Sequence, residues 1–130
     1  MPALERKKIL VVDDDPMFLM SIKAVIGGAT YDLLTARSGK EALEIIGKGM
    51  PDLIIVDAIM KEMNGFELTR AIREVDKEKK TPIIMLTGMR AESDAMHAKM
   101  AGVNLFLNKP VKGEDLLRHI RSLLGSSPFR

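Results

Sequence analysis

The sequence of 130 residues has no cysteine, so it offers neither a disulfide framework nor a thiolate metal site. It also lacks any apolar run near the roughly 20 residues that a membrane-spanning helix needs. The first residues, MPALERKK, do not contain the apolar stretch of a secretion signal. We therefore expect a cytoplasmic protein that does not contact a membrane.

A strong excess of one charge is absent as well. The 20 basic and 18 acidic residues leave a net charge of +2, which does not favour nucleic-acid binding by charge alone. Hydrophobic residues make up 46% of the chain and charged residues 29%, which is typical of a soluble globular protein. We predict a single domain over residues 1–130, with its core at about 7–124 and short polar tails at both ends.

Short apolar runs alternate along the chain with longer stretches of helical period. The runs ILVV, LIIV and IIML are apolar throughout, as expected for central strands of a parallel sheet that is covered on both faces. The predicted strands are 8–13, 31–36, 52–57, 83–86 and 104–108, and the predicted helices are 16–26, 38–46, 65–75, 91–102 and 114–124. Strand 31–36 is more polar and suits an edge. This alternation predicts an α/β fold with a doubly wound, five-stranded parallel sheet of strand order 2-1-3-4-5.

Two of the predicted helices begin with recognisable capping residues. Asp15 stands before Pro16, so we interpret Asp15 as an N-cap rather than as a ligand. Ser38 and Glu41 have the spacing of a capping box.

Polar residues follow the strands of the predicted sheet at the points where the strands end. Asp13 and Asp14 end the first strand, Asp57 ends the third, Thr87 ends the fourth, and Lys109 follows the fifth. Because the carboxyl ends of parallel strands meet at one edge of the sheet, these side chains should share one pocket. Taken alone, Asp13 could be a turn residue and Lys109 a solvated lysine. Their common position at this edge favours a functional site.

Carboxylates from neighbouring strands repel one another unless a cation lies among them. Oxygen ligands without cysteine or histidine suit Mg²⁺. With a lysine and a hydroxyl nearby, such a site could hold a phosphoryl group, and a carboxylate could act as the nucleophile. No G-x-x-x-x-G-K-[ST] or G-x-G-x-x-G loop is present to bind a nucleotide, so the phosphoryl group would come from another molecule.

The segments ILVVDDDP, PDLIIVDAIMKEMNGFEL, TPIIMLTG and AGVNLFLNKPV resemble, in order and spacing, the receiver domain of two-component response regulators. The resemblance covers nearly the whole chain. It implies a flavodoxin-like (βα)5 fold and a signalling domain, which catalyses only its own phosphorylation and slow autodephosphorylation. It also implies that a histidine kinase or a phosphotransfer protein is the input partner, and that this domain does not bind nucleic acid directly.

The same resemblance implies a role for each residue at the edge. Asp57 matches the phospho-acceptor, and Asp13 and Asp14 match the acidic pair that binds Mg²⁺ together with Asp57 and the backbone carbonyl of Ile59. The remaining matches are the switch hydroxyl of Thr87, the phosphoryl-binding Lys109, the switch aromatic Phe106 and Pro110, whose bond to Lys109 is expected to be cis.

Some residues depart from the family pattern. Lys61 stands where proline is usual, which predicts a less rigid loop after Asp57. Phe106 has no hydroxyl, so an inward rotamer would depend on packing alone. Ile59 and Met89 are apolar where residues flank the attacking water in relatives, which predicts slow self-dephosphorylation.

The resemblance places the output surface on the fourth helix, the fifth strand and the fifth helix, for a downstream protein or a self-dimer. Met96, Met100 and Leu105 could form an apolar patch there. The alternative, that the methionines belong to the core, is slightly favoured.

Two other functions are compatible with the sequence. A receiver-like interaction module would have the same fold without being phosphorylated. A phosphatase of the haloacid dehalogenase type resembles the pattern Asp13-x-Asp15, but that family needs further acids after its lysine. Only Glu114 and Asp115 follow here, at a predicted helix start. Whether the chain acts alone or within a longer regulator stays open.

Overall fold

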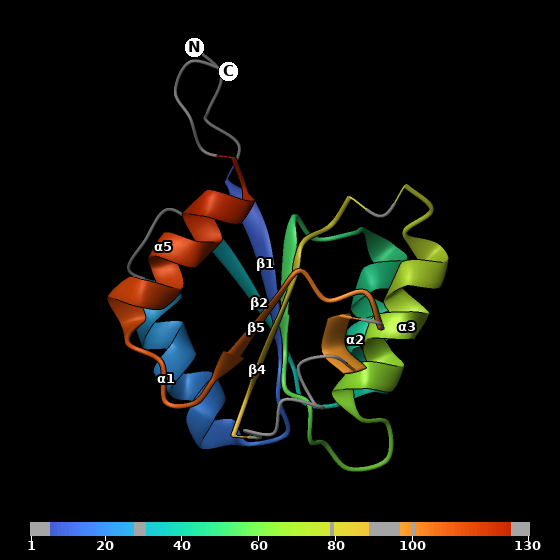
Figure 1. The fold of residues 1–130 in the computed structure, drawn as a ribbon, viewed down its shortest axis with the longest axis horizontal. Helices are drawn as coiled ribbons and strands as arrows, with labels where there is room; N and C mark the ends of the chain where they lie inside the picture. Colours follow the sequence, from blue (N-terminus) through green and yellow to red (C-terminus); the bar gives the residue numbers. More distant parts are fainter. Residues whose placement is uncertain (1–5, 28–30, 79, 89–96, 100, 126–130) are drawn as a thin grey trace.

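Five parallel strands form one sheet at the centre of the molecule (Figure 1). The computed structural model describes residues 6–27, 31–78, 80–88, 97–99 and 101–125. The strands are β1 (Lys7–Val12), β2 (Tyr31–Ala36), β3 (Leu53–Val56), β4 (Ile83–Thr87) and β5 (Leu105–Asn108). Their order in space is β2-β1-β3-β4-β5, which confirms the predicted fold and the edge position of residues 31–36.

Helices cover both faces of this sheet (Figure 1). α1 (Pro16–Ile26) and α5 (Gly113–Leu123) lie on one face, and α2 (Gly39–Lys48) and α3 (Gly65–Val75) lie on the other. Residues 97–99 and 101 are helical, within the predicted helix 91–102, most of which lies outside the described residues. No helix in the described part of the chain has the length and apolar character needed to cross a membrane.

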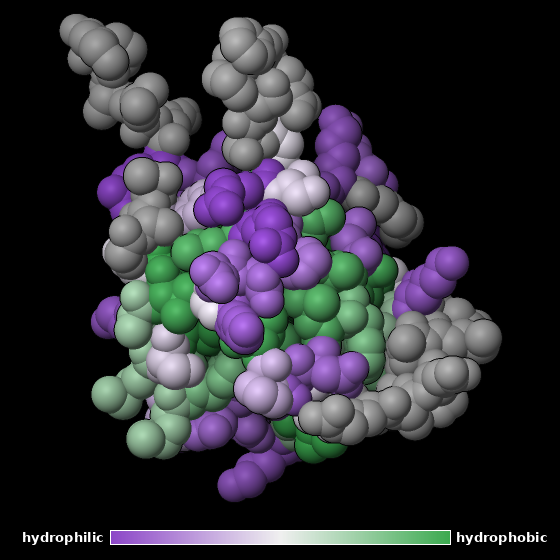
Figure 2. Space-filling model, turned by 60° about the vertical axis from the view of Figure 1, so that its left-hand side comes forward, coloured by the Kyte–Doolittle hydropathy of each residue, from purple (hydrophilic) through white to green (hydrophobic). Residues whose placement is uncertain are grey.

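Side chains of the central strands point alternately to the two faces of the sheet, and they divide the core into two apolar layers. Leu10 and Val12 of β1 belong to the layer under α2 and α3, whereas Ile9 and Val11 belong to the layer under α1 and α5. β3 and β4 are divided in the same way, because successive strand side chains point to opposite faces. Seen from the side of α1 and α5, the surface mixes hydrophilic residues with smaller hydrophobic areas (Figure 2).

The helix caps agree in part with the sequence prediction. The side chain of Asp15 accepts a hydrogen bond from the N–H of Met17 at 3.0 Å, which confirms this N-cap. Ser38 Oγ accepts from the N–H of Glu41 at 3.1 Å, but the carboxylate of Glu41 accepts from Arg37 rather than from Ser38. The predicted capping box is therefore only half formed, because the long side chain of Glu41 reaches one residue past the cap.

A complete capping box begins α3 instead. The side chain of Asn64 accepts from the N–H of Glu67, and the carboxylate of Glu67 accepts from the N–H of Asn64, both at 2.9 Å. This reciprocal pair ends the loop that follows β3 and so defines where the chain after Asp57 turns into a helix.

The predicted apolar patch on the fourth helix and fifth strand falls largely outside the described residues. Leu105 packs against the core layer under α1 and α5, whereas Phe106 packs against the layer under α2 and α3, because neighbouring residues of a strand face opposite ways. Leu105 is half-buried, so its contribution to a surface patch stays a prediction. Met96 and Met100 lie outside the described residues.

Candidate functional site

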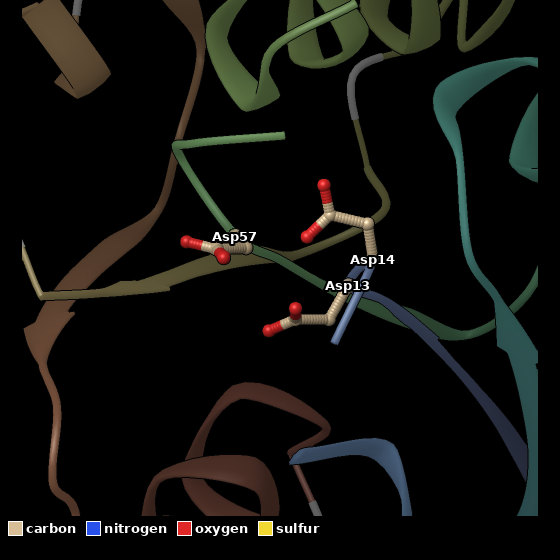
Figure 3. Close-up of side chains that lie close together, drawn as sticks. All are labelled: Asp13, Asp14 and Asp57. Carbon is tan, nitrogen blue, oxygen red and sulfur yellow. The ribbon is translucent and has the colours of Figure 1, made fainter. Parts of the chain in front are cut away.

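Three carboxylates lie together at the carboxyl edge of the sheet. Asp13 and Asp14 follow β1 and Asp57 follows β3, and one oxygen from each lies within 4.8 Å of the others (Figure 3). The backbone ladder continues into these residues, because the N–H of Asp57 donates to the carbonyl of Val12 at 3.1 Å. The sheet itself therefore sets the spacing of the acids.

Lys109 brings a positive charge to this cluster from the end of β5. Its Nζ lies 2.9 Å from Asp13 Oδ2 and 3.6 Å from Asp57 Oδ2. The N–H of Lys109 donates to the carbonyl of Thr87 at 2.7 Å, so the backbone beside β4 holds the lysine in place. The Lys109–Pro110 peptide bond is cis.

An aromatic ring from α1 completes the surroundings of the lysine. Nζ of Lys109 lies 3.9 Å from the centroid of the Phe18 ring, and both residues line a mostly apolar pocket between α1 and the start of α5. The cation is thus shared between two carboxylates and a ring face. Phe18 is not among the predicted site residues, because no local pattern relates this position of the helix to a lysine 91 residues later.

The three carboxylates are held in different ways. Asp13 is buried, and its two oxygens accept from the N–H of Asp15 and from Lys109, both at 2.9 Å. Asp14 is half-buried, and its Oδ2 accepts from the backbone N–H of Lys61 at 3.0 Å. Asp57 is also half-buried, and its Oδ1 accepts from the N–H of Ile59 at 3.3 Å.

Charge in this cluster is only partly balanced. Burial raises the pKa of Asp57, and the neighbouring charge of Asp13 raises it further. Lys109, the N–H of Ile59 and a hydrogen bond with the buried hydroxyl of Thr87 act in the opposite direction but do not cancel these two effects. One lysine among three acids leaves room for more positive charge.

A divalent cation fits this donor set. The ligand atoms are carboxylate oxygens in close proximity, with no sulfur or nitrogen donor among them, as hard ions such as Mg²⁺ prefer. Burial and the charge of Asp13 raise the pKa of Asp57, and a cation at this place would stabilise its charged form. The acids Glu114 and Asp115, which the phosphatase alternative would need, lie in the first turn of α5 and are not part of this cluster.

The loop after Asp57 approaches the site closely. A Cβ at Gly65 would collide with the backbone carbonyl of Asp57, so only glycine allows α3 to begin here. The sequence predicted a helix from residue 65 but gave no sign of this close approach. Phe106 is half-buried against the core layer under α2 and α3, and Met89 lies outside the described residues.

Comparison with known proteins gives a consistent result. Residues 9–121 match the family model of the response regulator receiver domain. The protein PilH of Pseudomonas aeruginosa is 30% identical over 90% of this chain and 97% of its own length. The probable transcriptional regulator ycf27 of Porphyridium aerugineum is 31% identical over 93% of this chain, which spans only 49% of that relative.

A solved structure shows the same fold. The chemotaxis protein CheY4 of Vibrio cholerae superposes with a TM-score of 0.87 at 34% sequence identity, covering 92% of this chain and 99% of that one.

Proposed function

This chain belongs to the response regulator receiver domain family, whose members act in two-component signalling, and we propose that it is switched by phosphorylation of Asp57. The observation that carries the proposal is the partly balanced cluster of Asp13, Asp14, Asp57 and Lys109, with Thr87 beside it. The proposed donor is a histidine kinase or a phosphotransfer protein. A cytoplasmic location and the single domain over residues 1–130 stay predictions from the sequence.

Asp57 is the best nucleophile of the three acids. Asp13 is only 1% exposed, and both of its oxygens already accept hydrogen bonds from the protein. Asp14 has no ion pair with Lys109 in the described part of the chain. The side chain of Asp57 is 12% exposed, and its Oδ2 lies at the longer distance of 3.6 Å from the ammonium group, which leaves this oxygen available for attack.

Phosphotransfer then follows from these positions. An oxygen of Asp57 attacks the phosphorus of a phosphohistidine, the O–P bond forms as the N–P bond breaks, and the imidazole nitrogen keeps the electron pair and takes up a proton. Lys109 moves its ammonium group toward a phosphoryl oxygen, and the Thr87 hydroxyl donates to another. Mg²⁺ bound by Asp13, Asp14, Asp57 and the Ile59 carbonyl would neutralise charge on the transferred group.

The test is the mass of the intact protein after incubation with acetyl phosphate and Mg²⁺. We expect the wild type to gain one phosphoryl group and Asp57→Asn to gain none. Asp115→Asn, an acid on α5 outside the cluster, is the matched control and should be phosphorylated like the wild type. A gain in Asp57→Asn would place the nucleophile elsewhere, and no gain in any protein would favour the interaction module that is not phosphorylated.

The proposed output is a change in surface. Movement of Thr87 toward the phosphoryl group would free space for Phe106. A face including β5, α5 and the predicted helix 91–102, most of which lies outside the described residues, would then bind a downstream protein or a second copy. We expect sedimentation or pull-down behaviour to differ between the protein with and without beryllofluoride, a phosphoryl mimic. Identical behaviour with every tested partner would contradict this part of the proposal.

We also propose that the phosphorylated state is long-lived. Ile59, two residues after Asp57, is 62% exposed and apolar, so it offers no group that could orient an attacking water. Ile59→Asn should shorten the lifetime of the phosphorylated protein once the donor is removed. Val75→Asn, at a 56% exposed position on α3, is the matched control. Rapid phosphate release from the wild type would show that the apolar residue does not slow hydrolysis.

A further inference from the structure

The loop after β3 contacts the opposite side of the acid cluster through a single backbone group. The N–H of Lys61 donates to Asp14 Oδ2 at 3.0 Å, although the two residues are 47 positions apart. We propose that this N–H is a positioning group for the cation site: it orients Asp14 and links the conformation of the loop to cation binding. The inference rests on the proposed metal site but not on phosphorylation of Asp57.

The orientation of Asp14 depends on this one hydrogen bond, whereas Asp13 and Asp57 are each held by more than one. Asp13 is held through both of its oxygens, and Asp57 is held by the N–H of Ile59 and by Thr87. Within the described residues, the N–H of Lys61 is the donor that the structure gives Asp14. With Oδ2 engaged, Oδ1 is left for a cation. Carboxylate ligands generally need such outer hydrogen bonds to keep their orientation.

The same contact also holds the segment that carries the proposed carbonyl ligand. Two hydrogen bonds fix this segment. The N–H of Ile59 donates to Asp57 at 3.3 Å, and the N–H of Lys61 donates to Asp14 at 3.0 Å. Met60, between them, is buried against the core layer under α2 and α3. The peptide of Ile59 is thus restrained on both sides by the acids that would share the ion with it.

The backbone just after the contact is strained. Glu62 has a φ of 68°, a left-handed value that residues other than glycine rarely adopt. Such a conformation persists only when its surroundings hold it. Here the Lys61–Asp14 hydrogen bond lies immediately before Glu62, and the capping box that begins at Asn64 lies two residues after it.

The residue type at position 61 makes the contact possible. Proline, which is usual there in the family pattern, has no N–H and could not donate to Asp14. From the sequence, a lysine in place of proline predicted a less rigid loop. The structure gives the loop an anchor that proline could not provide. Because Asp14 serves both the loop and the proposed site, cation binding and loop order are coupled, and the coupling is reciprocal.

The first test compares Mg²⁺ dissociation constants without any phosphoryl donor, measured by calorimetry. Lys61→Pro removes the N–H, and we expect Mg²⁺ binding to weaken roughly 3- to 10-fold, the usual range for losing one orienting hydrogen bond. Lys61→Ala keeps the N–H and removes the ammonium group, so its affinity should stay within about twofold of the wild type. Equal affinities for the proline variant and the wild type, or equal losses in both variants, would overturn the proposal.

A second measurement covers the chance that proline distorts the loop. Amide hydrogen exchange at Lys61, followed by NMR without Mg²⁺, should be slow in the wild type and faster in Asp14→Ala, which lacks the acceptor. Asp14→Asn retains an acceptor oxygen and should restore slow exchange. Exchange that is equal in all three proteins would disprove the anchor. If the wild type fails to bind Mg²⁺ while exchange behaves as expected, the metal site is wrong and the anchor stands.

Discussion

Two clusters of charged residues lie at opposite ends of the parallel strands, and they differ in how completely their charges are balanced. At the edge formed by the starts of β4 and β5, the guanidinium group of Arg73 bonds the carboxylate of Asp76 and the backbone carbonyls of Thr81 and Gly102 at 2.6–2.9 Å. It also donates to Asn104 Oδ1 at 2.7 Å. The cluster at the other edge has three acids and one lysine.

The difference separates a self-contained structural cluster from the cluster that we propose to be functional. The acceptors around Arg73 also receive backbone donors, since Thr81 donates to Asp76 and Ile83 donates to Asn104. This network ties α3 to both strands and needs nothing from outside. In the acid cluster, burial and the charge of Asp13 instead leave the pKa of Asp57 raised, so a cation placed there would stabilise the charged carboxylate.

The largest effect on stability is expected from removing Arg73, whose charge is balanced within its own cluster. Arg73→Ala leaves the buried carboxylate of Asp76 without its ion-pair partner, which should lower the free energy of unfolding by about 3–5 kcal/mol. Urea denaturation monitored by circular dichroism measures this loss. Arg118→Ala, which removes an exposed partner of Asp115, should cost less than about 1 kcal/mol. Similar losses in both variants would contradict the contrast between the clusters.

Removing a charge from the acid cluster should raise the stability of the protein, whereas removing Arg73 lowers it. Asp57→Asn removes the cost of burying this charge and the repulsion by Asp13, so without divalent ions this variant should be more stable than the wild type at neutral pH. Saturating Mg²⁺ should reverse the order, because only the wild type keeps the full set of ligands. Thermal melting with and without Mg²⁺ tests both statements, and a destabilised Asp57→Asn in the absence of metal would refute the first.

The pH dependence of this difference follows from the direction of the shift. Because the pKa of Asp57 is raised on folding, the folded state holds this proton more tightly than the unfolded chain does. The resulting stability is present below the ordinary pKa of 3.8 and is lost as the pH rises through the folded-state pKa. Thermal melting of both proteins as a function of pH should therefore show this loss of stability in the wild type and not in Asp57→Asn.

A smaller effect is expected at the ring beside Lys109. Phe18→Leu keeps an apolar side chain but removes the ring face 3.9 Å from the ammonium group. Phosphorylation of Asp57 by acetyl phosphate should slow about 2- to 5-fold, since an exposed cation–π contact contributes roughly 0.5–1 kcal/mol. Phe18→Tyr keeps the ring and should retain the rate. If leucine and tyrosine behave alike, the ring does not position the lysine.

The smallest effect is expected at the strained residue of the loop. Glu62→Gly suits a φ of 68°, so it should cost little or add a few tenths of a kcal/mol to stability despite the greater freedom of glycine when unfolded. Glu78→Gly, at an exposed residue without a positive φ, should lower stability instead. Calorimetric melting compares the two. A loss at position 62 as large as that at 78 would mean that Glu62 is not strained.

Local pattern was sufficient for most of the fold because strands and helices depend on near neighbours. The apolar runs predicted the central strands, Asp15 predicted a cap, and the strand ends placed Asp13, Asp57 and Lys109 at one edge. Arg73 was missed, since a charged residue on an amphipathic helix normally faces solvent. The half-formed cap at Ser38 was mispredicted because an equally good donor lies one residue earlier.

The sequence by itself determined the order of the strands and the edge at which the acids meet, since hydrophobic period and parallel topology suffice for both. Tertiary structure decided which donor each carboxylate receives. The contacts of Lys61 with Asp14 and of Phe18 with Lys109 join residues far apart in the chain. Hydrogen bonds and charges act over a few ångströms, and no local pattern reports distances of that size between distant segments.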